Sequence, residues 1–146
     1  MFKHILLATD GSAASERAAR AAVDLAREQS AVLTAVYVVD PYPYLGIGDT
    51  NPLGLHAYLG AARDHAAEAH ARVLQLAEQS GKKLDVRLRL LEDVTAAKGI
   101  LAAAKEAGAD VIVAGSHGRT GLDNLLLGSV AAKLAALSPV SVLIVR

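Results

Sequence analysis

KHILLATDGS, residues 3–12, is a short apolar run that ends in a turn signal. Branched and apolar side chains followed by Asp-Gly-Ser are typical of a buried β-strand that stops abruptly. The next segment, residues 13–29, repeats alanine and leucine at helical spacing, with charged residues elsewhere. A strand that passes directly into a helix is the first half of a β-α-β unit.

The same alternation continues along the chain. Further strands are expected over 32–39, 84–91, 110–116 and 140–146, and further helices over 55–80, 94–107 and 129–137. This alternation predicts an α/β fold with an open parallel sheet and helices on both faces. We expect five strands in the order 3-2-1-4-5, in a single domain over residues 1–146.

Several local features refine this expectation. Segment 40–54 holds three of the four prolines and is expected to be irregular, and Gly81 is expected just after the long helix. The polar alternation of 84–91 indicates an edge strand, and Gly99 is a weak point of its helix. The buried face of the first helix is expected to contain Ala14, Ala18, Ala21, Ala22, Leu25 and Ala26.

Composition restricts the class of protein. Hydrophobic residues make up 53% of the 146, which is enough for a packed core, and the chain has no cysteine for disulfides or thiolate metal sites. The 15 basic and 15 acidic residues balance, which argues against nucleic acid as the main partner. No apolar run approaches the ~20 residues of a membrane span, and no signal peptide is evident. We expect a cytoplasmic protein.

The predicted topology places a ligand site. In open parallel sheets, ligands bind outside the carboxyl ends of the strands, where the strand order reverses. Here the reversal lies between strands 3–9 and 110–116, whose ends carry Thr9-Asp10 and Gly115-Ser116-His117-Gly118. Asp10 could bind a ligand there, or could cap the first helix or form an Asx turn.

A second stretch, GSHGRTGLDNLLLGSV at residues 115–130, carries four glycines into the last helix. Ser129 is the expected N-cap, and the N–H groups of Gly128, Ser129 and Val130 would attract an anion. Glycines at both ends would let phosphate oxygens approach the backbone. The stretch contains neither a Walker A loop nor G-x-G-x-x-G, so it predicts a different phosphate cradle.

The spacing G-x2-G-x9-G-S resembles the nucleotide-binding signature of universal stress proteins. KHILLATDGS, YVVD after the second strand and SPVSVLIVR at the end strengthen the resemblance, which covers nearly the whole chain. It implies a Rossmann-like fold, a homodimer, and a subclass that binds ATP without a Walker loop.

The resemblance also assigns ten residues to the site of an adenine nucleotide: ATP, ADP or AMP. It places Asp10 and Val38 at the adenine end, Ala8, Thr9 and Gly115 at the ribose, and His117, Gly118, Gly128, Ser129 and Val130 around the phosphates, with Mg or Mn as an accompanying ion. One departure is that Glu92 and Asp93 stand where the family often has a glycine. They would alter the adenine pocket or cap the next helix.

Other polar residues leave alternatives open. For His117 we favour phosphate contact over catalysis, because no nucleophile is evident beside it. Arg119 could contact a γ-phosphate or lie on the surface. His56, His65 and His70 suggest a metal site, but His65 and His70 are roughly 140° apart around a helix, which favours surface positions. Tyr42, Tyr44 and Tyr58 would form a lid or a partner surface.

The leading interpretation is an ATP-binding stress or regulatory protein. One alternative is a slow ATPase, for which only Asp10, His117 and Arg119 are evident candidates. Another is a dimeric interaction module without nucleotide. The hydrophobic edge strand 140–146 predicts antiparallel pairing with a second copy, whereas in a monomer this edge would have to be covered.

Overall fold

The computed structural model describes residues 1–41, 52–118 and 127–146. Its strands are β1 (His4–Ala8), β2 (Val32–Val39), β3 (Val86–Glu92), β4 (Val111–Gly115) and β5 (Ser141–Val145). Its helices are α1 (Ala13–Gln29), α2 (Pro52–Gln79), α3 (Ala96–Ala107) and α4 (Ser129–Leu137). The strands form one parallel sheet in the order β3-β2-β1-β4-β5, which confirms the expected topology. The roles expected for Tyr42, Tyr44 and Arg119 lie outside the described residues.

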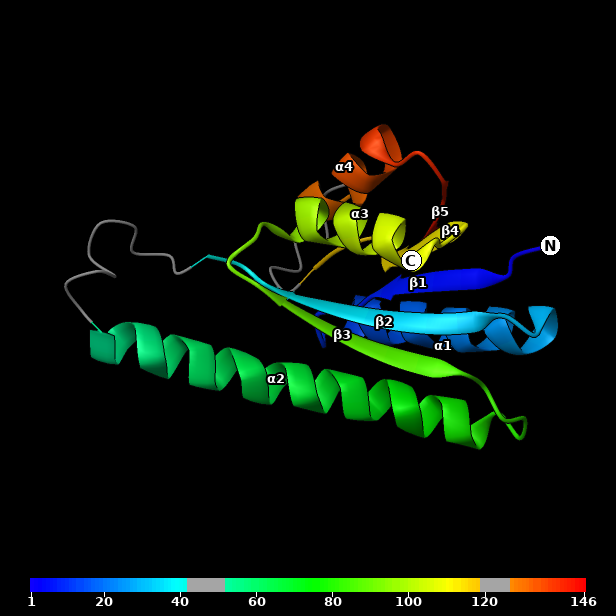
Figure 1. Ribbon diagram of the computed structural model, residues 1–146, viewed down its shortest axis with the longest axis horizontal. Helices are drawn as coiled ribbons and strands as arrows, with labels where there is room; N and C mark the ends of the chain where they lie inside the picture. Colours follow the sequence, from blue (N-terminus) through cyan, green and yellow to red (C-terminus); the bar gives the residue numbers. More distant parts are fainter. Residues whose placement is uncertain (42–51, 119–126) are drawn as a thin grey trace.

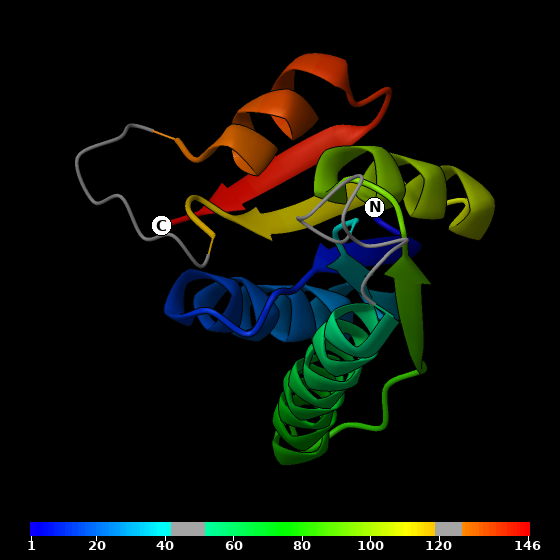
Figure 2. The ribbon, with the colours of Figure 1, turned by 90° about the vertical axis from the view of Figure 1, so that its left-hand side faces the viewer.

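Helices cover both faces of the sheet, with α1 and α2 on one face and α3 and α4 on the other (Figures 1 and 2). The central strand β1 is paired with β2 on one side and β4 on the other. Its three middle side chains are fully buried: Ile5 and Leu7 join the α1–α2 core, and Leu6 joins the α3–α4 core. Within the described part of the chain, no helix is long and apolar enough to cross a bilayer.

Helix α1 has the bounds expected from the sequence. Ser12 caps it, because its Oγ accepts a hydrogen bond from the Ser15 N–H at 3.2 Å. The buried face is wider and shifted from the expected one. Ala14, Ala18, Ala22 and Ala26 are buried as expected, Ala21 and Leu25 are only half-buried, and Ser15, Ala19 and Val23 are buried in addition.

Helix α2 begins at Pro52, three residues before the expected start. Proline suits the first turn of a helix, where its missing N–H would have no partner, so residues 52–54 belong to the helix and not to an irregular segment. The helix ends at Gln79, and Gly81 follows with a φ of +77°, in the left-handed conformation expected of a glycine after a helix.

The edge strand β3 runs over Val86–Glu92, two residues later than its expected start. Leu84 and Val86 pack on the α1–α2 core, whereas Leu88 and Leu90 stay about 40% exposed. α3 begins at Ala96 rather than 94, because Asp93 takes a left-handed φ of +57°. Gly99 is a contact point, since a Cβ there would lie 3.0 Å from Val94 Cγ1.

His70 contradicts the expectation of a surface position. Its ring packs edge-on against Tyr37, with centroids 6.4 Å apart, and its Nε2 is buried with no partner among the described residues. The positions one turn away on α2 are Ala66, Ala67, Val73 and Leu74, so no charged side chain of that helix face reaches the ring. Burial lowers the pKa of His70 below 6.5, against a smaller opposing effect of a hydrogen bond with the Arg89 backbone.

This lowered pKa makes the free energy of unfolding depend on pH. Below about pH 6.5 the unfolded chain binds a proton that the folded chain resists, so stability falls as the pH falls. We expect His70→Phe, which keeps an aromatic ring against Tyr37, to reduce this acid loss. Part of the loss should persist, because burial and then Arg87 also lower the pKa of His4.

Denaturant unfolding at about pH 5 and pH 7.5 would measure the effect. The matched control is His56→Gln, which removes an exposed histidine from the same helix. An acid loss in His70→Phe equal to that of His56→Gln would contradict the assignment.

Candidate functional site

A cavity of about 560 Å³ opens at the carboxyl ends of β1, β2 and β4. This is the edge of the sheet where the strand order reverses, between β1 and β4. All ten residues assigned by the sequence line this one cavity: Ala8, Thr9, Asp10, Val38, Gly115, His117, Gly118, Gly128, Ser129 and Val130. The structure therefore brings the expected residues together, and their contact with a ligand stays a prediction.

Two hydrogen bonds fix the end of β1. The Thr9 N–H donates to the Val36 carbonyl at 3.0 Å, which holds this residue against β2. The Asp10 carboxylate accepts the Ser12 N–H at 2.9 Å and so forms the Asx turn that leads into α1. Asp10 thus has a structural role in addition to its place in the cavity wall.

The start of α4 differs from the expectation in two ways. Gly128, not Ser129, is the N-cap residue, and the described residues supply no side-chain bond to this cap. The Gly128 N–H is not available to an anion, because it donates to the Ser116 carbonyl at 2.7 Å. The N–H groups of Ser129, Val130 and Ala131 have no carbonyl partner within the helix, and the first turn contains no acidic residue. This helix end is suited to an anion.

The glycines of the motif are in close contact with other parts of the chain. A Cβ on Gly115 would lie 2.9 Å from the Ala14 carbonyl carbon and oxygen, and one on Gly118 would lie 3.1 Å from Asp10 Oδ2. A Cβ on Gly128 would lie 3.2 Å from the Ser116 carbonyl oxygen. Internal packing therefore accounts for these glycines whether or not phosphate approaches them.

Gly115→Ala should destabilise the fold by about 2 kcal/mol, because backbone atoms of α1 cannot move away as a flexible side chain could. Gly60→Ala is the control, since nothing lies within 4 Å of its Cβ position on α2. That change should stabilise the protein by about 0.5–1 kcal/mol. Chemical denaturation would measure both, and an unchanged stability of Gly115→Ala would show that α1 and β4 have room to spare.

Helix α2 supplies two further cavity residues: Tyr58, which the sequence suggested for a lid or a partner surface, and His65, which was expected only on the surface. Tyr58 and His65 line the cavity, and the Tyr58 hydroxyl donates to the Asp40 carbonyl at 2.8 Å. On the opposite side of the cavity, Ala96 and Ile100 of α3 contribute apolar surface. Helical periodicity indicated that these residues lie in helices, but not which end of each helix reaches the sheet edge.

Glu92 and Asp93 do not line the cavity. Glu92 forms an ion pair with Arg63 of α2, with contacts of 2.7 and 3.1 Å. Asp93 occupies a left-handed turn that glycine adopts more easily. Thr95, not either acid, is the N-cap residue of α3. The departure from the motif thus falls on a turn and an ion pair rather than on the cavity wall.

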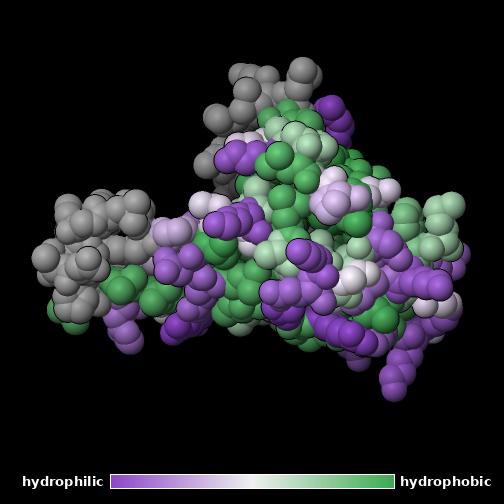
Figure 3. Space-filling view, turned by 45° about the horizontal axis from the view of Figure 1, so that its top comes forward, coloured by the Kyte–Doolittle hydropathy of each residue, from purple (hydrophilic) through white to green (hydrophobic). Residues whose placement is uncertain are grey.

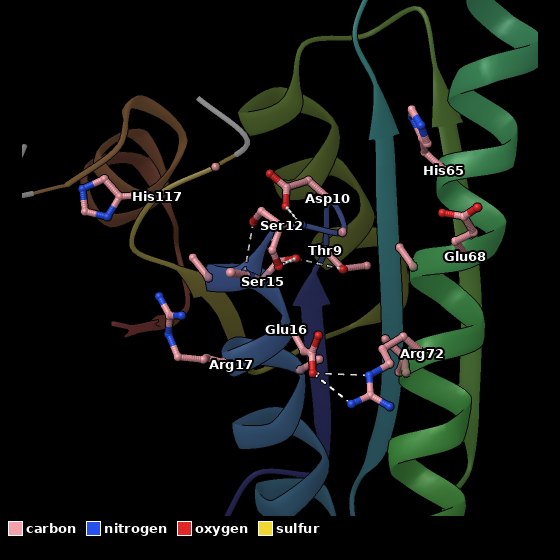
Figure 4. Close-up of a pocket in the computed structure, with 17 residues that line it drawn as sticks. Thr9, Asp10, Ser12, Ser15, Glu16, Arg17, His65, Glu68, Arg72 and His117 are labelled. Atoms are coloured by element: carbon pink, nitrogen blue, oxygen red, sulfur yellow. Dashed lines mark hydrogen bonds and ion pairs between the residues drawn. The ribbon is translucent and has the colours of Figure 1, made fainter. Parts of the chain in front are cut away.

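A second cavity of about 520 Å³ adjoins the first between α1 and α2 (Figure 4). Its wall includes Glu16 and Arg17 from α1, and Glu68 and Arg72 from α2. Arg72 donates to Glu16 at 2.9 Å across the cavity, and its hydrogen bond is the main cause of a lowered Glu16 pKa. His117 lines both cavities, and its Nδ1 lies 3.0 Å from Ser116 Oγ.

Comparison with known proteins identifies the family. A family model described as the Universal stress protein family matches residues 1–146. The chain belongs to the universal stress protein family. It is 36% identical over 146 residues to Universal stress protein MJ0531 of Methanocaldococcus jannaschii, which covers all of this chain and 83% of that protein.

Solved structures of the family share the fold. The universal stress protein UspA from Lactobacillus plantarum matches with a TM-score of 0.83 and 25% identity, over 99% of this chain and 97% of that one. A universal stress protein in complex with cAMP matches with a TM-score of 0.64 and 27% identity, over 99% and 97%. This universal stress protein therefore shares its Rossmann-like α/β architecture with both structures. The second of them contains an adenine nucleotide, cAMP.

Proposed function

We propose that this universal stress protein binds an adenine nucleotide, and that the bound nucleotide serves regulation rather than turnover. The observation that carries the proposal is the start of α4, where a helix end with no side-chain cap among the described residues borders a cavity at the sheet's switch point. Free N–H groups and the helix dipole there favour a phosphate group. The related protein bound to cAMP supports the same ligand class.

The cavity suits the rest of a nucleotide. Its volume of about 560 Å³ lies within the usual range of small-molecule pockets. Val38, Ala96 and Ile100 offer an apolar wall for a base at the β2 and α3 side, while Ser129 and Val130 lie at the phosphate side. ATP, ADP and AMP all fit this division of apolar and anion-binding surface.

A metal ion would depend on the nucleotide. Among the described residues, no group of three or more acidic, histidine or cysteine side chains is placed to hold one. Mg²⁺ and Mn²⁺ accept phosphate and water oxygens readily. An ion that accompanied ATP here would therefore take most of its ligands from the phosphates and from water.

Ser129→Asp tests the phosphate placement without damage to the helix. A carboxylate at a helix start is favourable by about 0.3–1 kcal/mol, so thermal stability should be kept or raised. The same carboxylate would repel phosphate, and ATP affinity should fall at least about tenfold. Calorimetric titration of nucleotide-free protein would measure it.

The matched control is Ala132→Asp, which adds the same charge to the exposed side of the same helix turn, outside the cavity. It should bind ATP nearly as wild type does. Equal affinities of the two variants would refute the phosphate placement at α4.

We also propose that two copies pair along β5, which is an edge strand of the sheet. Leu143 on this strand is 42% exposed, and Figure 3 shows hydrophobic surface over the neighbouring α3 and α4 side of the molecule. An exposed hydrophobic edge favours antiparallel addition of the same strand from a second chain. Such pairing would cover the β5 edge of both copies at once.

Light scattering should therefore give twice the 15.1 kDa mass of one chain. Leu143→Lys should shift the mass toward the monomer, because like charges would face one another across the paired strands. Leu74→Lys is the control, on α2 and 44% exposed, and should leave the dimer intact. A monomeric wild type would refute the pairing.

A further inference from the structure

The two cavities are two chambers of one cleft around the carboxyl end of β1. They have similar volumes, about 560 and 520 Å³. Six residues line both: Thr9, Asp10, Ser15, His65, His117 and Gly118. His117 and Gly118 belong to the stretch expected to contact phosphate, whereas Thr9 and Asp10 are expected at the ribose and adenine, so the second chamber borders the first along the end of β1 and is reached from its phosphate side as well.

The inner surface of the second chamber is apolar and made of small side chains. Ala14 and Ala19 come from α1, and Ala69 and Val73 come from α2. Each of these four is at most 7% exposed, so they form a well-packed floor with few protruding atoms. A surface of this kind suits a flat, weakly polar group such as a nucleobase.

The rim of the chamber carries charged groups of both signs. Figure 4 shows Arg17 on the α1 side and Glu68 on the α2 side, with the Glu16–Arg72 ion pair between the two helices. Neither Arg17 nor Glu68 forms an ion pair with another described residue, so both are available to a ligand. A free carboxylate accepts hydrogen bonds from hydroxyl groups, and a guanidinium donates to ring and carbonyl acceptors.

The charge balance of the second chamber disfavours a second polyanion. The chamber wall has three carboxylates, on Asp10, Glu16 and Glu68, against the guanidinium groups of Arg17 and Arg72. A phosphate chain would therefore be held at α4, where the carboxylates are absent from the first helix turn. A group that bears hydroxyls and carries no net charge matches the second chamber better.

We propose that the chamber between α1 and α2 is a nucleoside subsite, so that the preferred ligand of the cleft is a dinucleotide. One nucleoside would occupy the first chamber, the bridging phosphates would lie beside His117, Gly118 and the start of α4, and the second nucleoside would rest on the alanine floor. Hydroxyl groups of the second ribose would donate to Glu68. This inference rests on the proposed adenine-nucleotide function.

The test compares ATP with diadenosine polyphosphates that contain two to five bridging phosphates, by calorimetric titration of the nucleotide-free full chain. The best of this series should bind at least about tenfold more tightly than ATP, because the second nucleoside adds contacts within the same binding event. Glu68→Ala should reduce affinity for that dinucleotide about five- to tenfold, since it removes a charged acceptor. Affinity for ATP should stay within twofold.

The matched control is Glu78→Ala, an exposed glutamate further along α2 that lines neither chamber. It should leave both affinities unchanged. If ATP binds and no member of the series binds more tightly, the subsite is refuted and the proposed function stands. A Glu68→Ala variant that weakens ATP and dinucleotide equally would also refute it. If neither ligand binds, the proposed function itself fails.

Discussion

The burial of the middle of β1 on both faces of the sheet is the constraint on which the rest of the structure depends. A strand with Ile5 and Leu7 on one face and Leu6 on the other has no solvent-facing side. It must therefore lie inside the sheet with helices above and below. Its carboxyl end then lies between two neighbouring strands, and the chain has to leave the sheet there to begin α1. Thr9 and Asp10, at this exit, border both chambers of the cleft for that reason.

The two helices that start near this exit differ at their N-termini. α1 has a Ser12 cap, and Glu16 in its first turn is engaged by Arg20 and Arg72. The charge of Glu16 at the start of α1 is thus paired within the protein. α4 begins at Ser129, after the Gly128 cap position; the described residues supply no side-chain bond to this cap, and the first turn has no acidic residue. Among the described residues, the helix with N–H groups left available is the one that borders the wall expected to hold phosphate, as the proposed nucleotide site requires.

The sequence predicted the sheet well because the burial of strands and helices leaves a strong periodic pattern. Residues 13–29, 32–39 and 129–137 match the observed elements at both ends. The expectations fail where the three-dimensional path of the chain, and not the local sequence pattern, determines the structure. Asp93 in a left-handed turn delays α3, Gly128 takes the cap position expected for Ser129, and His70 is buried by the way α2 packs against Tyr37. Local composition carries no record of these three relations.

The ten site residues could be brought together from the sequence because parallel strands end at one edge and the helices that follow them start there. His65 could not, since the rotation of α2 about its axis determines whether it faces the cavity. The glycine motif adds a further step to this argument. Gly115 admits Ala14 of α1, Gly118 admits Asp10, and Gly128 admits the backbone of Ser116. Each glycine thus lets a neighbouring part of the chain pack closely against the segment around the end of β4. The hydrogen bond from the Gly128 N–H to the Ser116 carbonyl fixes where α4 begins. The spacing of the motif therefore specifies the position of a free helix start, and an affinity for phosphate would follow from that position rather than from the glycines themselves.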